Sequence, residues 1–266
     1  MSILILGGTA DARRLTEKLH QQGLMLVYSV AGLVRTPNVS CEIISGGFTQ
    51  FGGLVEYLRL RKADRKPISA ILDVTHPYAN KMSGNAVLAA KEMAIPCWRF
   101  QRPAWEMQEG DHWQLFENWE LLLPALAGYQ SIFFTAGQLY QATIRSLGQS
   151  FSEQSFSEHP ISEQAPQKYL LRTAVAPTVS LPSTMQWIKA IGPFDYQNEL
   201  DLMRQHHVDL LVSKNSGGDS TVAKLEVARD LAIPVFMLAR PTLAKADRTY
   251  NDIQEYENDI VNQLKN

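Results

Sequence analysis

Short, continuous apolar runs alternate with amphipathic stretches in the first half of the chain. The apolar runs, which suit strands covered on both faces of a sheet, lie at 2–8, 24–32, 68–77 and 97–103. Apolar residues recur at helical spacing in the segments between them, at 10–23, 52–62 and 83–96. This alternation predicts a parallel sheet whose strands are joined by crossover helices.

The same pattern starts again near residue 125. Strand-like runs lie at 131–137, 169–177, 209–218 and 234–241, and helical spacing recurs at 197–208 and 221–232. The last amphipathic stretch, 250–266, predicts a closing helix. A chain of 266 residues exceeds the usual size of one domain. We therefore expect an N-terminal nucleotide-binding domain over 1–124 and a C-terminal α/β domain over 125–266 that includes the closing helix.

A polar tract interrupts the second domain at about 150–166. It is rich in serine and glutamate and repeats a five-residue unit. Such a composition buries too little apolar surface to offset the entropy lost on ordering. We expect an exposed, mobile insertion without a function of its own.

Composition and charge narrow the function classes. Hydrophobic residues make up 45% of the chain and charged residues 20%, as in ordinary globular proteins. A formal charge of −2 gives no field that collects nucleic acid or an anionic membrane, so we expect small-molecule partners. Cys41 and Cys97 lie in no paired motif, and neither a signal peptide nor a membrane-spanning run is present. These features predict a cytoplasmic protein.

The first candidate site follows the first predicted strand. Gly7, Gly8 and Thr9 lead from that strand into a helix, where free backbone N–H groups and the positive helix end favour an anion such as a nucleotide phosphate. The match to the dinucleotide-binding glycine motif is partial, because Thr9 and Ala12 stand where that motif has glycine. The alternative is a tight turn that uses glycine only for its backbone freedom.

Residues near the second predicted strand bear on the choice of cofactor. An NAD site usually has an acid near the end of this strand, but none lies between residues 27 and 37. Ser29 and Arg35 are found there instead, and Arg13 and Arg14 lie in the first turns of the preceding helix. This balance favours a 2′-phosphate, and so NADPH over NADH, unless the arginines simply face water.

The second half contains another candidate site after a strand. The loop at 213–218 ends in two glycines, and lysine and arginine side chains nearby would suit a ligand that carries carboxylates. The candidate substrate-binding residues are Lys214, Asn215, Ser216, Gly217, Gly218, Thr221, Lys224 and Arg240. The alternative is a solvated loop in which 219–221 cap the next helix. Asp195, in a similar turn, is predicted to be a helix cap.

The sequence lacks the motifs of short-chain dehydrogenases, of metal sites and of acyl-transfer enzymes. No tyrosine is followed by lysine at a distance of four residues, as short-chain dehydrogenases require. The histidines show no metal-ligand spacing, and no GxSxG nucleophile motif is present. We therefore predict no metal site and no acyl transfer.

Four ordered segments together resemble the precorrin-6A reductases of cobalamin biosynthesis. They are ILGGTADARRL near the start, DVTHPYA at 73–79, IGPF at 191–194, and SKNSGG with AKLEVARDLAIPVFMLARP within 213–241. The resemblance implies two Rossmann-like α/β domains with parallel sheets flanked by helices, a reduced nicotinamide cofactor, and a tetrapyrrole macrocycle held in a cleft between the domains. It also implies hydride delivery to C19 of precorrin-6A and protonation at C18, which gives precorrin-6B.

In the light of this resemblance, the segment 73–86 contributes to the site. Its first residues end a central strand, where open α/β sheets place their ligands, so Thr75 is assigned to the cofactor. His76 and Tyr78 are the candidate catalytic residues, able to hydrogen-bond a carboxylate or relay a proton. The alternative is a structural histidine bonded to backbone. The chain departs from the family where arginine usually follows Ala-Gly, since Leu33 stands there.

Two rival functions stay open at this point. The nearer is the cobalt-precorrin-6A reductase of the anaerobic pathway, for which NADH is an alternative cofactor. The rival from another class is a non-catalytic nucleotide-binding sensor on the same scaffold. If the chain is a reductase of precorrin-6A or of cobalt-precorrin-6A, we also expect transient contact with neighbouring enzymes of cobalamin biosynthesis.

Overall fold

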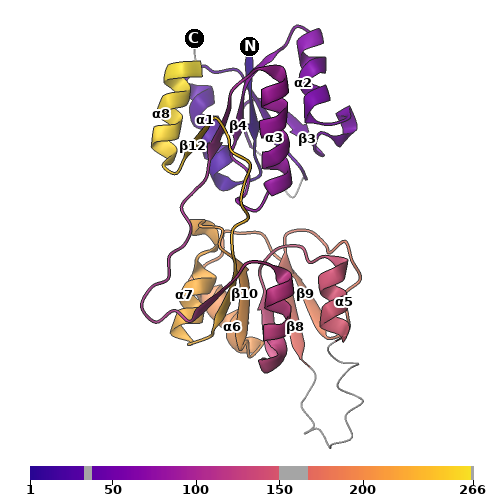
Figure 1. Ribbon diagram of the computed structural model, residues 1–266. Coiled ribbons are helices and arrows are strands. Elements are labelled where there is room, and N and C mark those ends of the chain that lie inside the picture. The colour runs from indigo at the N-terminus through magenta and orange to yellow at the C-terminus, as the bar shows by residue number, and fades with distance from the viewer. Residues whose placement is uncertain (33–37, 150–166, 265–266) are drawn as a thin grey trace, which may run out of the picture. The chain divides into compact units, whose positions relative to one another are not determined.

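The computed structural model describes residues 1–32, 38–149 and 167–264, and it divides into two compact units (Figure 1). The first unit comprises Met1–Pro103 and Pro241–Asn266, and the second comprises Ala104–Arg240. Arg35 and the expected insertion at 150–166 lie outside the described residues.

The first unit is built on a six-stranded parallel sheet with the order β12-β5-β4-β1-β2-β3. Its strands are β1 (Ser2–Leu6), β2 (Leu26–Val30), β3 (Glu42–Ser45), β4 (Ile68–Asp73), β5 (Cys97–Phe100) and β12 (Arg248–Tyr250). Chain order reverses between β1 and β4, so the loops that follow these two strands leave in opposite directions. Open α/β sheets bind their ligands at such a switch point.

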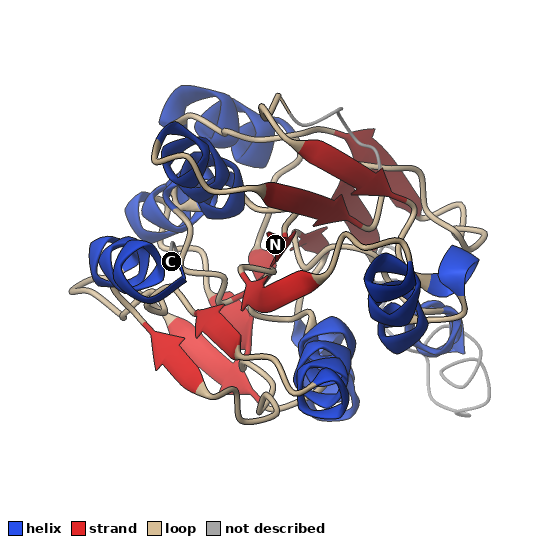
Figure 2. Ribbon diagram, turned by 90° about the horizontal axis from the view of Figure 1, so that it is seen from above, coloured by secondary structure: helices blue, strands red, loops and turns tan. Residues whose placement is uncertain are grey.

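Helices cover both faces of this sheet (Figure 2). On one face lie α1 (Ala10–Gln21) and α8 (Ile253–Leu264), whose buried residues include Leu15, Leu19, Tyr256 and Ile260. On the other lie η1 (Thr49–Phe51), α2 (Leu54–Ala63) and α3 (Asn80–Met93). The spacing of Leu15 and Leu19 buries one side of α1, as the apolar pattern predicts.

The second unit repeats this architecture with the sheet order β6-β11-β10-β7-β8-β9. Its strands are β6 (Trp113–Phe116), β7 (Ser131–Phe134), β8 (Lys168–Thr173), β9 (Met185–Lys189), β10 (Leu210–Lys214) and β11 (Val235–Leu238). Its helices are α4 (Trp119–Leu122), η2 (Leu123–Gly128), α5 (Gln141–Gln149), α6 (Tyr196–Gln205), η4 (Asp219–Thr221) and α7 (Ala223–Asp230). All of its strand pairs are parallel, and the order reverses between β7 and β10. The predicted fold class, two α/β domains with parallel sheets flanked by helices, is confirmed.

The predicted domain limits need correction. β6 follows β5 along the chain but pairs with β11 in the second unit, whereas β12 follows β11 but pairs with β5 in the first. The boundary therefore falls at 103/104 rather than 124/125, and the closing helix α8 belongs to the first unit. Local hydrophobic pattern identifies a strand, but it does not reveal which sheet edge that strand joins, because pairing is a long-range contact.

Among the described residues, no helix is both long enough and apolar enough to cross a membrane.

Candidate functional site

The loops after β1 and β4 lie at the switch point of the first sheet, so both candidate segments of the first unit meet at one sheet edge. Leu6 pairs with Asp73 in the ladder, and the Val74 N–H donates to the Leu6 carbonyl at 3.0 Å. The structure thus brings Thr9, Thr75 and His76 to neighbouring strand ends.

Gly7 and Gly8 shape the turn that leads from β1 into α1. A Cβ at Gly7 would lie 2.2 Å from Cζ of Tyr28, so only glycine fits above this ring. The Gly7 N–H donates to the Ser29 carbonyl at 2.8 Å, and the Gly8 N–H donates to Oη of Tyr28 at 2.9 Å. Gly8 has a φ of +101°, which favours glycine. Because both amides already have acceptors, neither is free for a phosphate as the sequence predicted.

Thr9 fixes the start of α1 and ties it to β4. Its Oγ1 accepts from the Ala12 N–H at 3.1 Å and donates to the Val74 carbonyl at 2.9 Å. Among residues 1–32, 38–149 and 167–264, no acceptor is found for the N–H groups of Ala10 and Asp11. These two amides, at the positive end of a 12-residue helix, are the donors that suit an anion. The donors that would suit an anion therefore lie further along the turn than the glycines.

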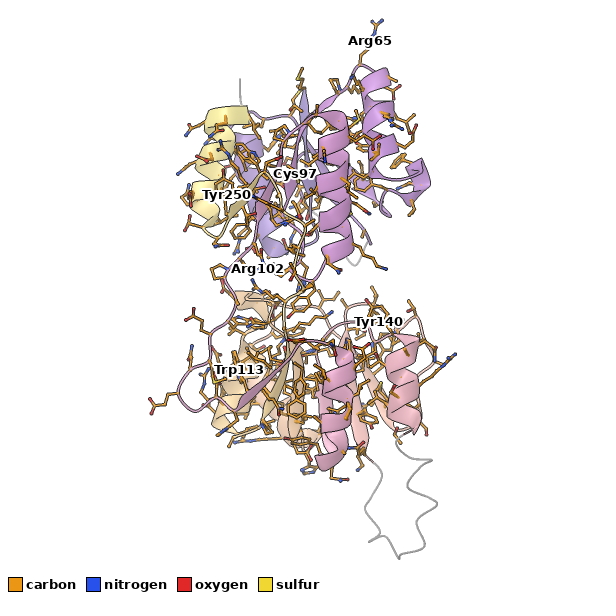
Figure 3. The ribbon with its side chains drawn as sticks, viewed as in Figure 1. Arg65, Cys97, Arg102, Trp113, Tyr140 and Tyr250 are labelled. Atoms are coloured by element: carbon orange, nitrogen blue, oxygen red, sulfur yellow. The ribbon has the colours of Figure 1, made fainter. Side chains whose placement is uncertain are left out.

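Charged side chains surround this helix end. Asp11 forms ion pairs with Arg14 at 2.6 Å and with Arg102 at 3.3 Å, which offsets its negative charge next to the anion site. Arg102, labelled in Figure 3, follows β5. Arg13 is exposed. Burial raises the pKa of Tyr28, while the Gly8 amide and the charge of Arg13 act to lower it.

Ser29 lies in β2 and is buried, with 5% of its surface exposed. Because side chains alternate along a strand, Ser29 and Tyr28 face opposite sides of the sheet. Only its carbonyl has a described contact in the glycine turn. Its assignment to the cofactor stays a prediction.

Asp73 organises the end of β4. Its side chain is 1% exposed. Oδ1 accepts from the Thr75 N–H at 3.3 Å and from Oγ1 of Thr75 at 2.7 Å, while Oδ2 accepts from Nε of Arg99 at 2.8 Å. Nη1 of Arg99 donates to the Ala244 carbonyl at 2.7 Å, which links β5 to the segment that returns from the second unit. The end of β4 is therefore held by a buried, paired carboxylate.

His76 is exposed and Tyr78 is half-buried, immediately after this strand end. The Tyr78 N–H donates to Nδ1 of His76 at 3.3 Å, and the two ring centroids lie 5.6 Å apart. With Nδ1 accepting, the neutral imidazole carries its proton on Nε2.

The loop after β10 is built from internal contacts. The side-chain amide of Asn215 accepts from the Trp105 N–H at 2.8 Å and donates to the Trp105 carbonyl at 2.9 Å. Nε of Arg240 donates to the Asn215 carbonyl at 2.8 Å. These contacts give Asn215 and Arg240 a loop-holding role that the sequence did not indicate. Gly217 has a φ of +68°, so the turn requires glycine there.

The predicted capping of α7 is wrong. Residues 219–221 form the short helix η4, and Oγ1 of Thr221 donates to the Gly218 carbonyl at 3.3 Å. The helix α7 begins at Ala223 without a side-chain cap. Asp195, in contrast, caps α6 as predicted, since its carboxylate accepts from the Asn198 N–H at 2.9 Å.

Lys224 is buried in the second unit, with 4% of its surface exposed. Its Nζ lies 5.3 Å from the ring centroid of Trp105. Nearby Glu199 is bonded to Arg172 by both carboxylate oxygens, so it is already paired. Burial lowers the pKa of Lys224 to about 7, and the charge of Arg172 adds to this lowering, while Glu199 opposes it. Lys224 therefore changes charge near neutral pH.

Lys214 ends β10 and is half-buried, which lowers its pKa. A Cβ at Gly137 would lie 3.8 Å from Nζ of Lys214, so this ammonium reaches the loop after β7. Ser216 is buried at 9% exposure, and Gly218 is buried as well. The structure thus gathers Lys214 and the predicted loop residues at the switch point between β7 and β10.

The family of the chain follows from comparison with known proteins. A model of the family described as precorrin-6x reductase CbiJ/CobK matches residues 2–260. The chain belongs to this family.

Members of the family resemble the chain along its length. The precorrin-6A reductase of Rhodococcus erythropolis is 37% identical over 257 residues, and the match covers 94% of each chain. The cobalt-precorrin-6A reductase of Priestia megaterium is 25% identical over 276 residues and covers 99% of each. A solved structure described as CobK precorrin-6A reductase aligns with a TM-score of 0.80 and 29% identity, covering 98% of this chain and 97% of that one. The resemblance expected from the sequence is confirmed.

The sequence analysis missed several residues that shape the two candidate sites. They are Tyr28, Arg99, Trp105, Arg172 and Glu199. The two arginines had a sequence signal, because each stands inside an otherwise apolar strand and a buried charge needs a partner. The partners themselves, Asp73 and Glu199, are distant in sequence and only the fold identifies them. In the described part of the chain, no group of three or more metal-ligating side chains is found.

Substitution of Lys224 by methionine should stabilise the protein in a pH-dependent way. The pKa of Lys224 is lowered on folding, so between pH 7 and the usual lysine value the unfolded chain binds one more proton, and wild-type stability rises with pH across this window. The gain from Lys224→Met should therefore be fully present below about pH 7, on the order of 4 kcal/mol, and should disappear as the pH approaches about 10.5.

Urea denaturation at several pH values measures this gain. Lys168→Met, at an exposed lysine of the same unit, is the control and should change stability little at any pH. A Lys224→Met gain that is the same at pH 6 and pH 10 would contradict a buried, charge-changing lysine.

Proposed function

We propose that the chain reduces precorrin-6A to precorrin-6B, with NADPH as the hydride donor and C19 of the macrocycle as the acceptor. The observation that carries the proposal is the match to a precorrin-6A reductase at 37% identity over 94% of both chains. The two strand-end sites are consistent with it, because one suits an anionic cofactor and the other a substrate that carries carboxylates.

The first unit is the proposed cofactor site. The amides of Ala10 and Asp11 and the positive end of α1 suit the pyrophosphate. Exposed Arg13, in the first turns of α1, supplies a positive charge that suits the 2′-phosphate of NADPH. When bound, this cofactor supplies the hydride. The chain's own contribution is to fix its position over the ends of β1 and β4.

The second unit is the proposed site for the macrocycle carboxylates. Lys214 and Lys224 are the positively charged groups that would bind them, and the glycine loop after β10 offers backbone amides. Asn215 and Arg240 contribute by holding that loop in place. Positioning of this kind accounts for much of the rate of a hydride transfer, because the reacting carbon must meet the nicotinamide.

His76 and Tyr78 are the proposed catalytic pair. His76 is exposed immediately after β4, at the edge of the cofactor site, and its imidazole is the group that would hydrogen-bond a substrate carboxylate or pass a proton toward C18. The Tyr78 amide orients the imidazole through Nδ1. Tyr78 thus acts through its backbone by orienting His76.

The second candidate function is reduction of cobalt-precorrin-6A. Family membership alone fits both substrates, since the family includes enzymes described either way. The identity of 37% to a precorrin-6A reductase, against 25% to a cobalt-precorrin-6A reductase, favours the metal-free substrate.

The proposed reaction is tested by mixing the purified protein with NADPH and precorrin-6A. The nicotinamide absorbance should fall in step with the change in the pigment spectrum, and omission of precorrin-6A should stop both. Cobalt-precorrin-6A in a parallel reaction should be turned over more slowly. If NADPH is not oxidised with either macrocycle, the reductase function is contradicted. The rival function, a non-catalytic nucleotide-binding sensor, would then be favoured.

Arg13→Gln should weaken the use of NADPH selectively. Loss of a charged partner for the 2′-phosphate should raise KM for NADPH about tenfold and leave KM for NADH nearly unchanged. Arg14→Gln is the matched control, because Arg14 is paired with Asp11 at the pyrophosphate end and its loss should change KM for NADPH and NADH to the same extent. If Arg13→Gln changes KM equally for the two cofactors, Arg13 does not bind the 2′-phosphate.

His76→Ala should lower turnover far more than stability. An exposed side chain contributes little to folding, whereas loss of a proton donor costs on the order of a hundredfold in rate. The paired measurements are kcat and the thermal unfolding midpoint, with His20→Ala as the control at an exposed histidine on α1. Parallel losses of kcat and stability would support the structural alternative.

A further inference from the structure

Arg99 has a donor that the protein leaves unused. The side chain is buried in β5, with 4% of its surface exposed. Nε donates to Asp73 and Nη1 to the Ala244 carbonyl, but within the described ranges Nη2 is buried and has no acceptor. A buried N–H of a charged group that lacks an acceptor is destabilising, so its persistence points to an acceptor supplied by a ligand.

Arg99 also lines a small pocket at the end of β4. The pocket has a free volume of about 10 Å³, which is close to the space of one water-sized atom. Its wall includes Asp73, Thr75, His76 and Ser83. All of these residues belong to the first unit. The pocket thus has room for one polar atom of a larger molecule that lies outside it.

The order of the sheet indicates which part of a dinucleotide would reach this pocket. With the pyrophosphate at the β1–α1 turn and the adenosine ribose toward β2, the other half of the cofactor extends across β1 toward β4 and β5. Arg99 lies in β5 and Thr75 directly follows β4. The nicotinamide half therefore points to the Arg99 pocket. This step rests on the proposed use of NADPH.

The donors and acceptors at the pocket match a carboxamide. Nη2 of Arg99 is a donor without a partner, and it suits the carboxamide oxygen. Oγ1 of Thr75 gives its hydrogen to Asp73 and so keeps lone pairs for the carboxamide NH2. The charges of Arg99 and Asp73 offset each other, which favours a neutral polar group over a phosphate or a carboxylate.

We propose that Arg99 and Thr75 bind the carboxamide of the NADPH nicotinamide, with Asp73 as the positioning residue that holds both. Arg99 donates through Nη2 to the carboxamide oxygen, and Thr75 accepts from the carboxamide nitrogen. Arg99 then helps to determine which carbon of the macrocycle accepts the hydride, because it fixes the rotation of the nicotinamide ring.

The test compares two ligands that share the adenosine end of the cofactor. NADPH has the nicotinamide carboxamide and 2′,5′-ADP lacks it. Dissociation constants are measured for both with the wild type, with Arg99→Lys, which keeps a positive charge beside Asp73, and with Thr75→Val, which keeps the shape of the threonine. Each variant should weaken NADPH binding about tenfold or more and change 2′,5′-ADP binding less than twofold.

The outcomes separate the inference from the proposed function. Equal weakening of both ligands, or unchanged NADPH binding by folded variants, overturns the carboxamide site while NADPH use by the wild type stands. If Arg99→Lys does not fold, Thr75→Val decides alone by the same comparison. If the wild type binds neither ligand, the proposed cofactor and this inference fail together.

Discussion

The buried carboxylate of Asp73 is the constraint on which the first site depends. A buried charge is costly unless it is paired and fully hydrogen-bonded, and Asp73 meets this condition with Arg99 and with both donors of Thr75. Through Arg99 the same carboxylate reaches the carbonyl of Ala244, in the segment that carries β12 and α8 back to the first unit. One side chain thus couples the ends of two strands, the loop that presents His76 and the closing part of the chain.

The pairing of β12 with β5 explains why this coupling is needed. Each sheet has the same order about its switch point. The first sheet is completed by β12, which follows the whole of the second unit along the chain, whereas β6 lies near the start of the second unit's single segment. The chain consequently passes between the units twice, at 103/104 and at 240/241. Arg99 and Asn215 lie close to these crossings in their own units, where Arg99 binds Ala244 and Asn215 binds Trp105. The groups that shape each candidate site are therefore also those that hold the connecting segments in place.

Sequence pattern predicted the two parallel α/β domains because their central strands are continuous apolar runs, and it located both switch-point loops. It did not predict the four edge strands β3, β6, β9 and β12, whose few residues carry little periodic pattern. It assigned the free amides to Gly7 and Gly8 because the packing of Tyr28 under that turn is not visible in a local motif. It did not predict that Asn215 holds Trp105 for the same reason, since the two residues lie 110 positions apart. The sequence did contain one signal for two of the missed residues. Arg99 and Arg172 are charged residues within otherwise apolar strands, and such residues need a buried partner.

The central claim is that the first unit binds the dinucleotide with its pyrophosphate at the start of α1 and its nicotinamide toward β4 and β5. A crystal structure of the chain with NADP⁺ tests this most directly. The account predicts the pyrophosphate within hydrogen-bond distance of the Ala10 and Asp11 amides, the 2′-phosphate near Arg13, and the nicotinamide ring beside Thr75. A dinucleotide bound instead against the loop at 215–218 of the second unit would contradict it.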